Sequence, residues 1–244
     1  MIYVVGDEQI SHFQSLFEIL KRLEEPYAKG LYHLAYGMVD LPSGKMKSRE
    51  GNVVDADELM AEVKDIARKN LTERGELEVL STAEKETIID RIALGALKYY
   101  ILKVGPMRRM IFNPEESLDM QGDTGPYIQN AFVRIQSILR KANPDGKTLA
   151  FDYPTLSSSE KELIVLLASF PSVISSAADK YDPSIVASFN YALAKTFHRF
   201  YHDMSIIKAE SEDAKKFRLT LATEVGHVLA KGMDLIGVEM PDRM

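Results

Sequence analysis

The sequence contains no cysteine, which excludes disulfide bonds and metal sites built from thiolates. It also lacks an apolar run near the ~18 residues that a transmembrane helix needs, so we expect no membrane-spanning segment. The first residues, Met1 to Asp7, have no basic flank and no cleavage signal, and they do not read as a signal peptide. Together these absences predict a cytoplasmic protein that does not contact a membrane.

Size and charge set wide bounds on the class of protein. The 244 residues suffice for one large domain or for a small and a medium one, and 45% of them are apolar. The net charge is −6, but residues 126–150 carry four Lys/Arg against one Asp, and residues 191–220 carry six against four acids. An acidic body with local basic stretches fits a protein that touches polyanions on one face. Ordinary surface variation accounts for the same counts.

The beginning of the chain mixes strand and helix patterns. Ile2 to Val5 is a short β-branched and aromatic run that predicts a buried strand, and an amphipathic helix follows it. A second apolar run, from Leu31 to Leu41, predicts one or two strands. Because a buried parallel strand needs neighbours on both sides, we expect the chain to begin in the middle of a sheet.

From residue 55 onwards the patterns are helical. Ser81 and Glu84 have capping-box spacing before a long amphipathic helix, and Pro126 suits the first position of another. A later helix is expected to start at Ser159 and to break at Pro171, and the last helix is expected to stop at Gly232. The sequence therefore predicts a small α/β part followed by an all-α part, with the boundary at or slightly before residue 81.

The stretch from Gly44 to Val54 (GKMKSREGNVV) lies between these two parts and places two lysines, an arginine and a serine between glycines. Lysine ammonium groups on a flexible loop can offset charge that builds on a leaving pyrophosphate, and glycines let the backbone approach phosphates. The stretch is not a phosphate loop of the G-x-x-x-x-G-K-[ST] kind, because no second glycine precedes Lys45 at that spacing. The alternative is a solvated turn.

The same stretch resembles the second signature loop, K-M-S-K-S, of class I aminoacyl-tRNA synthetases, in the K-M-x-[ST]-R-x-G-x-V-V form of the arginyl enzymes. Three further blocks resemble that family in the same order: residues 3–13 before the loop, residues 122–131 at the start of the first anticodon-domain helix, and residues 218–238 at the closing helix. The four blocks span the whole chain.

The resemblance implies a mainly α, C-terminal fragment of an arginyl-tRNA synthetase. Residues 1–75 would be the truncated end of a Rossmann-like catalytic domain, and residues 76–244 an all-α helical-bundle anticodon-binding domain. The family's His-x-Gly-His signature and its N-terminal tRNA-contacting domain are absent from the sequence. The parent protein would ligate arginine to tRNA(Arg) with ATP and Mg²⁺. We expect the fragment to be a monomer, to bind no ATP and to be inactive alone.

The resemblance also assigns roles in the loop and near it. Lys45 and Lys47 would be catalytic, and Lys45, Met46 and Ser48 would contact ATP. The general class pattern has lysine where this chain has Ser48, so Lys45 is the safer phosphate contact. Gln9 follows a predicted strand and would hold the substrate arginine. The alternative for Gln9 is a helix-start glutamine that faces water.

Candidate RNA contacts lie on the predicted helices. Aromatic side chains stack on unpaired bases and arginines hold phosphates, whereas Phe197 and Phe200 are expected in the core. A solvated helix face is the alternative for the arginines near residue 134. The candidate tRNA-binding residues are Arg134, Arg140, Arg199, Tyr201, His202 and Met244, the last by resemblance to the family's C-terminal methionine.

Other classes of function stay open. His198 and His202 have the spacing of zinc ligands on a helix, but no third ligand is evident, so we expect no metal site. A helical protein-interaction module derived from a synthetase would have the same sequence features. So would a complete small nucleotidyl-transferring enzyme, which ATP binding by the chain would reveal.

Overall fold

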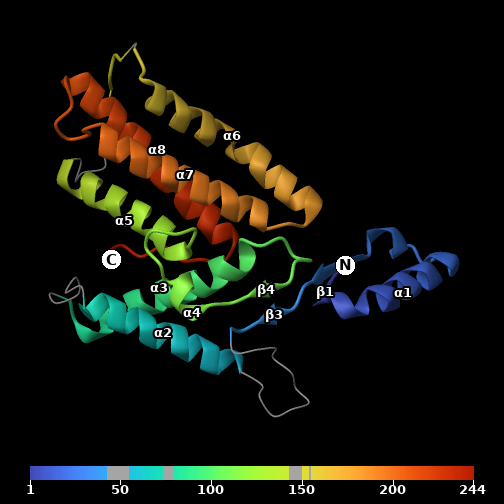
Figure 1. The fold of residues 1–244 in the computed structure, drawn as a ribbon. Coiled ribbons are helices and arrows are strands. Elements are labelled where there is room, and N and C mark those ends of the chain that lie inside the picture. Colours follow the sequence, from blue (N-terminus) through green and yellow to red (C-terminus); the bar gives the residue numbers. More distant parts are fainter. Residues whose placement is uncertain (43–54, 74–79, 143–149, 154) are drawn as a thin grey trace.

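The computed structural model describes residues 1–42, 55–73, 80–142, 150–153 and 155–244, and the arrangement of its elements is shown in Figure 1. The elements in chain order are β1 Ile2–Gly6, the 3-10 turn η1 Asp7–Gln9, α1 Ile10–Arg22, η2 Ala28–Gly30, β2 Tyr32–Tyr36, β3 Val39–Asp40, α2 Ala56–Glu73, α3 Thr82–Leu102, β4 Met110–Ile111, α4 Pro114–Ser117, α5 Gly125–Ala142, α6 Ser158–Lys180, α7 Ser184–Asp203 and α8 Glu212–Leu235. The mainly α fold predicted from the sequence is confirmed.

The first part of the chain is a β-α-β unit that projects from the helical body (Figure 1). Strands β1 and β2 pair in parallel, with Ile2 opposite Tyr32 and Gly6 opposite Tyr36. Helix α1 covers one face of the pair, where Phe13 lies 5.0 Å from Tyr3, measured between ring centroids. Apolar residues stay exposed here, among them Val4 with 63% of its surface accessible. The predicted strand–helix–strand pattern is confirmed, but the prediction that the first strand is buried is wrong, because Ile2 and Val4 are exposed.

A second unit surrounds the paired helices α2 and α3. Strand β3 pairs in parallel with β4, and helix α4 follows β4. Apolar side chains of α2, α3 and the segment around α4 share one buried core: Leu59, Val63, Ala67, Leu71, Ile88, Ile89, Ile92, Ala93, Ala96, Tyr100, Phe112 and Leu118. This core joins helices on both sides of residue 75, so the position of the domain boundary stays a prediction.

Helices α5 to α8 form the largest body, with α7 packed against the other three. Phe197 and Phe200 are fully buried in it, as the sequence predicts. Helix α3 connects this body to the second unit because Tyr99 faces the bundle core while Ile92 faces the other core. Helices α3 and α5 cross closely, because a Cβ added to Gly125 of α5 would lie 2.5 Å from the carbonyl oxygen of Gly95 of α3.

Helix α6 corrects two predictions about where a helix starts and breaks. It begins after Ser157, whose hydroxyl accepts from the amide of Glu160 in a full capping box, rather than at Ser159. It then runs without a break through Pro171 to Lys180. Proline in a helix interior removes one backbone hydrogen bond and costs roughly 3 kcal/mol. Burial of apolar residues against α7 and α8 offsets that cost, since Leu163, Phe170 and Ala177 repeat every seven residues on the packed face.

Helix α8 corrects a third prediction. Gly232 does not stop the helix but lies buried inside it, against the side-chain amide of Asn190 on α7. The chain leaves the helix after Leu235, and Gly237 adopts φ +72°, a left-handed conformation that favours glycine. Gly232 permits α7 and α8 to cross closely. From the sequence alone, a glycine at a helix crossing looks the same as a glycine at a helix end.

One helix of the described chain, α6, is long and apolar enough to cross a membrane by length and composition alone, with a mean hydropathy of 1.4. This differs from the expectation of no such segment, which rested on a search for an unbroken apolar run. Helix α6 packs along α7 and α8, and 11% of its apolar window is buried.

Candidate catalytic edge and RNA-binding face

Of the predicted catalytic and ATP-binding residues, Lys45, Met46, Lys47 and Ser48 lie outside the described residues. The flanks of this signature-like stretch are described. Strand β3 leads into the stretch, and Asp55 follows it with an Oδ1 that accepts from the amide of Asp57, 3.0 Å away, at the start of α2. A paired strand thus precedes the signature-like stretch in the chain, and a capped helix follows it.

The carboxyl edge of the β1–β2 pair gathers polar side chains. Parallel strands end at one edge, and ligand groups in α/β sheets come from that edge. Gln9 lies there, exposed, in the turn after β1, and Tyr36 ends β2 with 46% of its surface accessible. Asp7, in the same turn, has a buried Oδ1 with no hydrogen-bond partner among the described residues. Sequence reasoning missed Asp7, although its place directly after a strand was a usable signal.

The second candidate region lies where α5 meets α7, and we call Tyr127, Arg134, His198 and Tyr201 the α5–α7 face. The guanidinium carbon of Arg134 lies 5.0 Å from the ring centroid of Tyr201, a cation–π arrangement. Nη1 of Arg134 lies 3.2 Å from Nδ1 of His198, and the His198 ring lies 4.8 Å from the ring of Tyr127. Tyr201 is 39% exposed, so the cluster is open to solvent.

The face combines two predicted contacts with two residues that sequence reasoning missed. Arg134 and Tyr201 were predicted from the polar face of one helix and from an aromatic segment of another, and the fold brings them together. Tyr127 and His198 were not proposed as RNA contacts. Tyr127 was detectable from the sequence, because it is an aromatic residue seven positions before Arg134. That spacing places the two side chains on the same side of a helix.

The remaining candidates on α7 lie apart from this face. Arg199 forms an ion pair with Glu162 of α6. His202 is largely exposed and lies 2.9 Å from a carboxylate oxygen of Asp203. The described residues contain no group of three metal-ligating side chains, and His198 is already bonded to Arg134.

Arg140 and Met244 lie in a third region, which the last residues of the chain help to form. Nη1 of Arg140 donates to the carbonyl of Asp242 at 3.3 Å, and Met244 packs against the core of α2 and α3. Arg91, Arg140 and Arg243 line a hollow of about 470 Å³ there, together with acidic residues that include Glu84 and Asp242. The sequence-level grouping of Arg134 with Arg140 is therefore not kept by the fold, because six residues along a helix do not share a face.

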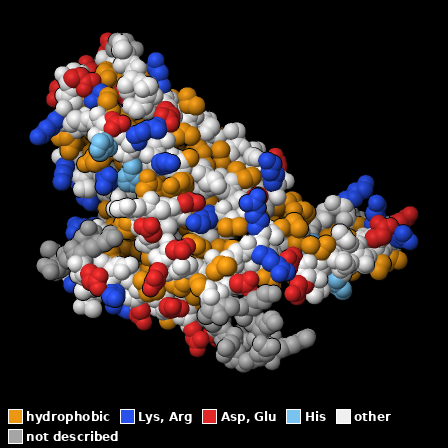
Figure 2. All heavy atoms as spheres, in the orientation of Figure 1, with side chains coloured by type: hydrophobic (Ala, Val, Ile, Leu, Met, Phe, Trp, Pro, Cys, Tyr) orange, Lys and Arg blue, Asp and Glu red, His pale blue; other side chains and the backbone are white. Residues whose placement is uncertain are grey.

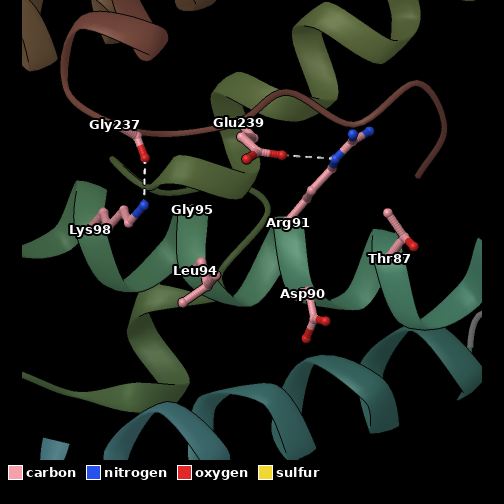
Figure 3. A pocket seen from close by; sticks show the side chains of 8 residues that line it. All are labelled: Thr87, Asp90, Arg91, Leu94, Gly95, Lys98, Gly237 and Glu239. Carbon is pink, nitrogen blue, oxygen red and sulfur yellow. Dashed lines mark hydrogen bonds and ion pairs between the residues drawn. The ribbon is translucent and has the colours of Figure 1, made fainter. Parts of the chain in front are cut away.

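The segment after α8 is fastened to α3, as Figure 3 shows. Lys98 donates to the carbonyl of Gly237 at 2.7 Å, and Nε of Arg91 lies 3.2 Å from a carboxylate oxygen of Glu239. From α5, the side-chain amide of Gln129 donates to the carbonyls of Arg91 and Glu239. These contacts fix the path by which Met244 reaches the second core.

Comparison with known proteins gives the class of this chain. The catalytic domain of class I tRNA synthetases (R) matches residues 1–113, and the DALR anticodon-binding domain matches residues 128–244. The chain is thus the junction of a class I catalytic domain with a helical anticodon-binding domain.

Proteins that align with the whole of this chain give a more specific result. The arginine–tRNA ligases of Parabacteroides distasonis and Bacteroides thetaiotaomicron are each 49% identical over 247 aligned residues, covering 100% of this chain and 41% of theirs. The arginyl-tRNA synthetase of Thermus thermophilus superposes with a TM-score of 0.89 at 29% identity, over 100% of this chain and 41% of that one. The enzyme from Plasmodium falciparum shares the fold, with a TM-score of 0.81 at 23% identity. The whole chain is thus similar to arginyl-tRNA synthetases, and it spans about 41% of the length of these relatives.

Proposed function

We propose that the whole protein ligates arginine to tRNA(Arg) with ATP and Mg²⁺, and that this chain supplies its second signature loop and its anticodon-binding surface. The consecutive match of a class I catalytic domain and a DALR domain carries the proposal. The names of the relatives that align over the whole chain support it.

At the catalytic edge, the proposed roles follow the family. Lys45 and Lys47 offset the charge on the leaving pyrophosphate, with Met46 and Ser48 as further ATP contacts. Gln9 holds the substrate arginine at the carboxyl end of β1, where ligand groups of α/β sheets lie. The sequence contains no His-x-Gly-His signature, so we expect the isolated chain to bind no ATP and to form no aminoacyl-tRNA.

The α5–α7 face is the proposed centre of RNA binding. Tyr201 offers a partly exposed ring for a base, and Arg134 offers a cation. Arg140, Arg199, His202 and Met244 extend the proposed contacts. Of these, Arg199 has a carboxylate partner that RNA must displace, so we expect it to contribute less than Arg134.

Aminoacylation by the isolated chain tests the catalytic part. The chain is mixed with arginine, ATP, Mg²⁺ and tRNA(Arg), and a longer protein that includes the missing signature is the positive control. We expect product only with the control. Arginine-dependent product from the chain alone, or ATP binding by it in calorimetry, overturns the prediction and favours a complete small enzyme.

Binding of an RNA hairpin with an arginine anticodon loop tests the RNA part. We expect weak binding whose affinity falls steeply with salt, because phosphate contacts release counterions. Arg134→Gln should weaken binding and flatten the salt slope, whereas Lys21→Gln on exposed α1 should leave both unchanged. Absence of hairpin binding, with salt-insensitive binding to a protein partner, favours the interaction module instead.

The proposal includes a cytoplasmic, monomeric protein that does not contact membranes. Size-exclusion chromatography with light scattering checks the monomer.

A further inference from the structure

His198 is central to the α5–α7 face. A guanidinium group has only donors, so the 3.2 Å contact between Nη1 of Arg134 and Nδ1 of His198 makes the imidazole the acceptor. The ring is therefore neutral and carries its proton on Nε2. We propose that His198 is a positioning residue that holds the Arg134 guanidinium for a backbone phosphate of bound RNA. This inference rests on the RNA-binding function proposed above.

Arg134 is held from two sides. The Tyr201 ring lies under its guanidinium group, and His198 accepts one of its N–H groups. Four N–H donors remain for a phosphate, which arginine binds through paired hydrogen bonds. A long side chain that is already ordered loses less rotamer freedom on binding, so preorganisation raises affinity.

The charge of Arg134 is not taken up by a described carboxylate. No described acid forms an ion pair with it, whereas Arg199 on the neighbouring face is paired with Glu162. A neutral acceptor such as imidazole orients the guanidinium without cancelling its charge. That combination suits a residue whose task is to attract an anion.

The surroundings of His198 keep its ring neutral. Burial lowers the pKa of His198 most and the positive charge of Arg134 lowers it further, which together outweigh the raising effect of the Tyr127 backbone. Tyr127 faces the ring from α5, and Lys195, Tyr201 and His202 lie within about one helical turn of it on α7. Its Nε2 is buried without a hydrogen-bond partner among the described residues.

The arrangement predicts how acid affects the pair. Protonated His198 cannot accept from Arg134 and places a second cation beside it. The coupling between the two residues is therefore present above the pKa of His198 and lost as the pH falls through it. Because that pKa is lowered, the midpoint lies below the ordinary histidine value of 6.5.

A double-mutant cycle on the 244-residue chain tests the inference, with a labelled RNA hairpin that carries an arginine anticodon loop. His198→Phe keeps an aromatic ring but has no acceptor. His198→Asn places a neutral amide oxygen near the position of Nδ1. At about pH 7.5 we expect His198→Phe to weaken binding roughly three- to tenfold and His198→Asn to stay within about twofold of wild type. In an Arg134→Gln background, His198→Phe should cause no further loss.

The pH dependence separates positioning from packing. As the pH falls through the pKa of His198, the wild type should approach the affinity of His198→Phe, while His198→Asn keeps its advantage over His198→Phe. Circular dichroism checks that each variant is folded. An equal effect of His198→Phe with and without Arg134 overturns the inference, and so does a folded His198→Asn that binds as weakly as His198→Phe.

A measurement without RNA separates this inference from the proposed function. Nitrogen-15 NMR of labelled histidine should show the Nε2–H tautomer and a pKa below 6.5 that moves towards the ordinary value in Arg134→Gln. If that pair is seen but no hairpin binds, the RNA function fails and the positioning role fails with it. If the hairpin binds but the pair is not seen and the cycle is additive, only the positioning role fails.

Discussion

The helical bundle and the β-α-β unit at the beginning of the chain bury their apolar residues to very different extents. In the bundle, Leu193, Phe197 and Phe200 have no accessible surface. In the unit, Ile2, Val4 and Leu23 are between 48% and 65% exposed, although both strands and the helix are formed. Apolar side chains gather at the surface where this unit projects (Figure 2). Local patterns thus suffice to form elements, but of these two regions only the bundle encloses its core.

The bundle also contains buried charge, which the unit does not show. Arg218 on α8 is 2% exposed and bonds to Glu160, which has no accessible surface, with Nε to Oε1 at 2.8 Å. Arg218 also donates to a second carboxylate, that of Glu210, to the hydroxyl of Tyr153 and to the carbonyl of Ser205. These contacts fasten the start of α6 and the segment before α8 to one side chain.

Hydrogen exchange should show the widest difference between the two regions. Amides of β1 and β2 exchange through local opening, whereas the central amides of α7 need opening of a closed core. We expect protection factors to differ at least about a thousandfold. Mass spectrometry of peptides from both regions measures this difference. Equal protection would mean that the unit and the bundle unfold as one.

Arg218→Met should be the most damaging single substitution considered. It leaves the buried carboxylate of Glu160 without its partner and should cost about 3–5 kcal/mol of unfolding free energy. Urea denaturation followed by circular dichroism measures the loss. Glu210→Gln is the control, because Glu210 is 60% exposed and its removal should have a much smaller effect. Similar losses for the two variants would contradict the assignment.

Two glycines offer a matched pair across the regions. A Cβ on Gly232 would overlap the side-chain amide of Asn190, and a Cβ on Gly6 would meet nothing within 4 Å. Gly232→Ala should therefore destabilise by about 1–3 kcal/mol, whereas Gly6→Ala should stay within about 0.5 kcal/mol. Thermal melts of both variants test this. An unchanged melting temperature for Gly232→Ala would show that α7 and α8 can move apart with little loss of free energy.

The smallest expected effects concern two valines. Val225 in α8 has no accessible surface, so Val225→Thr buries a hydroxyl and should cost about 1–2 kcal/mol. Val4→Thr on the exposed strand should change stability by less than about 0.5 kcal/mol. Urea denaturation curves of the two variants measure both changes in unfolding free energy. A large effect at Val4 would mean that the exposed face of the unit is covered in this chain.

Much of the secondary structure follows from local signals. The capping box of Ser81 and Glu84 is present as predicted, and just before α7 the carboxylate of Asp182 accepts from the amide of Ser184 at 3.0 Å. Such contacts join residues two or three positions apart, so the sequence already contains both partners. The signature-like stretch from residue 44 to 54 likewise pointed to the family without any knowledge of the fold.

The helix ends that were predicted wrongly are those where tertiary packing overrides a local signal. Pro171 and Gly232 each indicate a helix end by local rules, yet each lies inside a helix whose neighbours stabilise it. Local sequence does not record which helix will lie alongside, so it cannot tell a helix stop from a close crossing.

The sequence by itself pointed to the family, to the β-α-β unit, to most of the long helices and to the residue types suited to RNA, but not to the short strand β4. The tertiary structure decided which of those residues meet: Arg134 joins Tyr201 and His198, whereas Arg140 joins the last residues of the chain. The reason is geometric. Periodicity shows which residues share a face of one helix, and only the packing of helices sets which faces oppose each other.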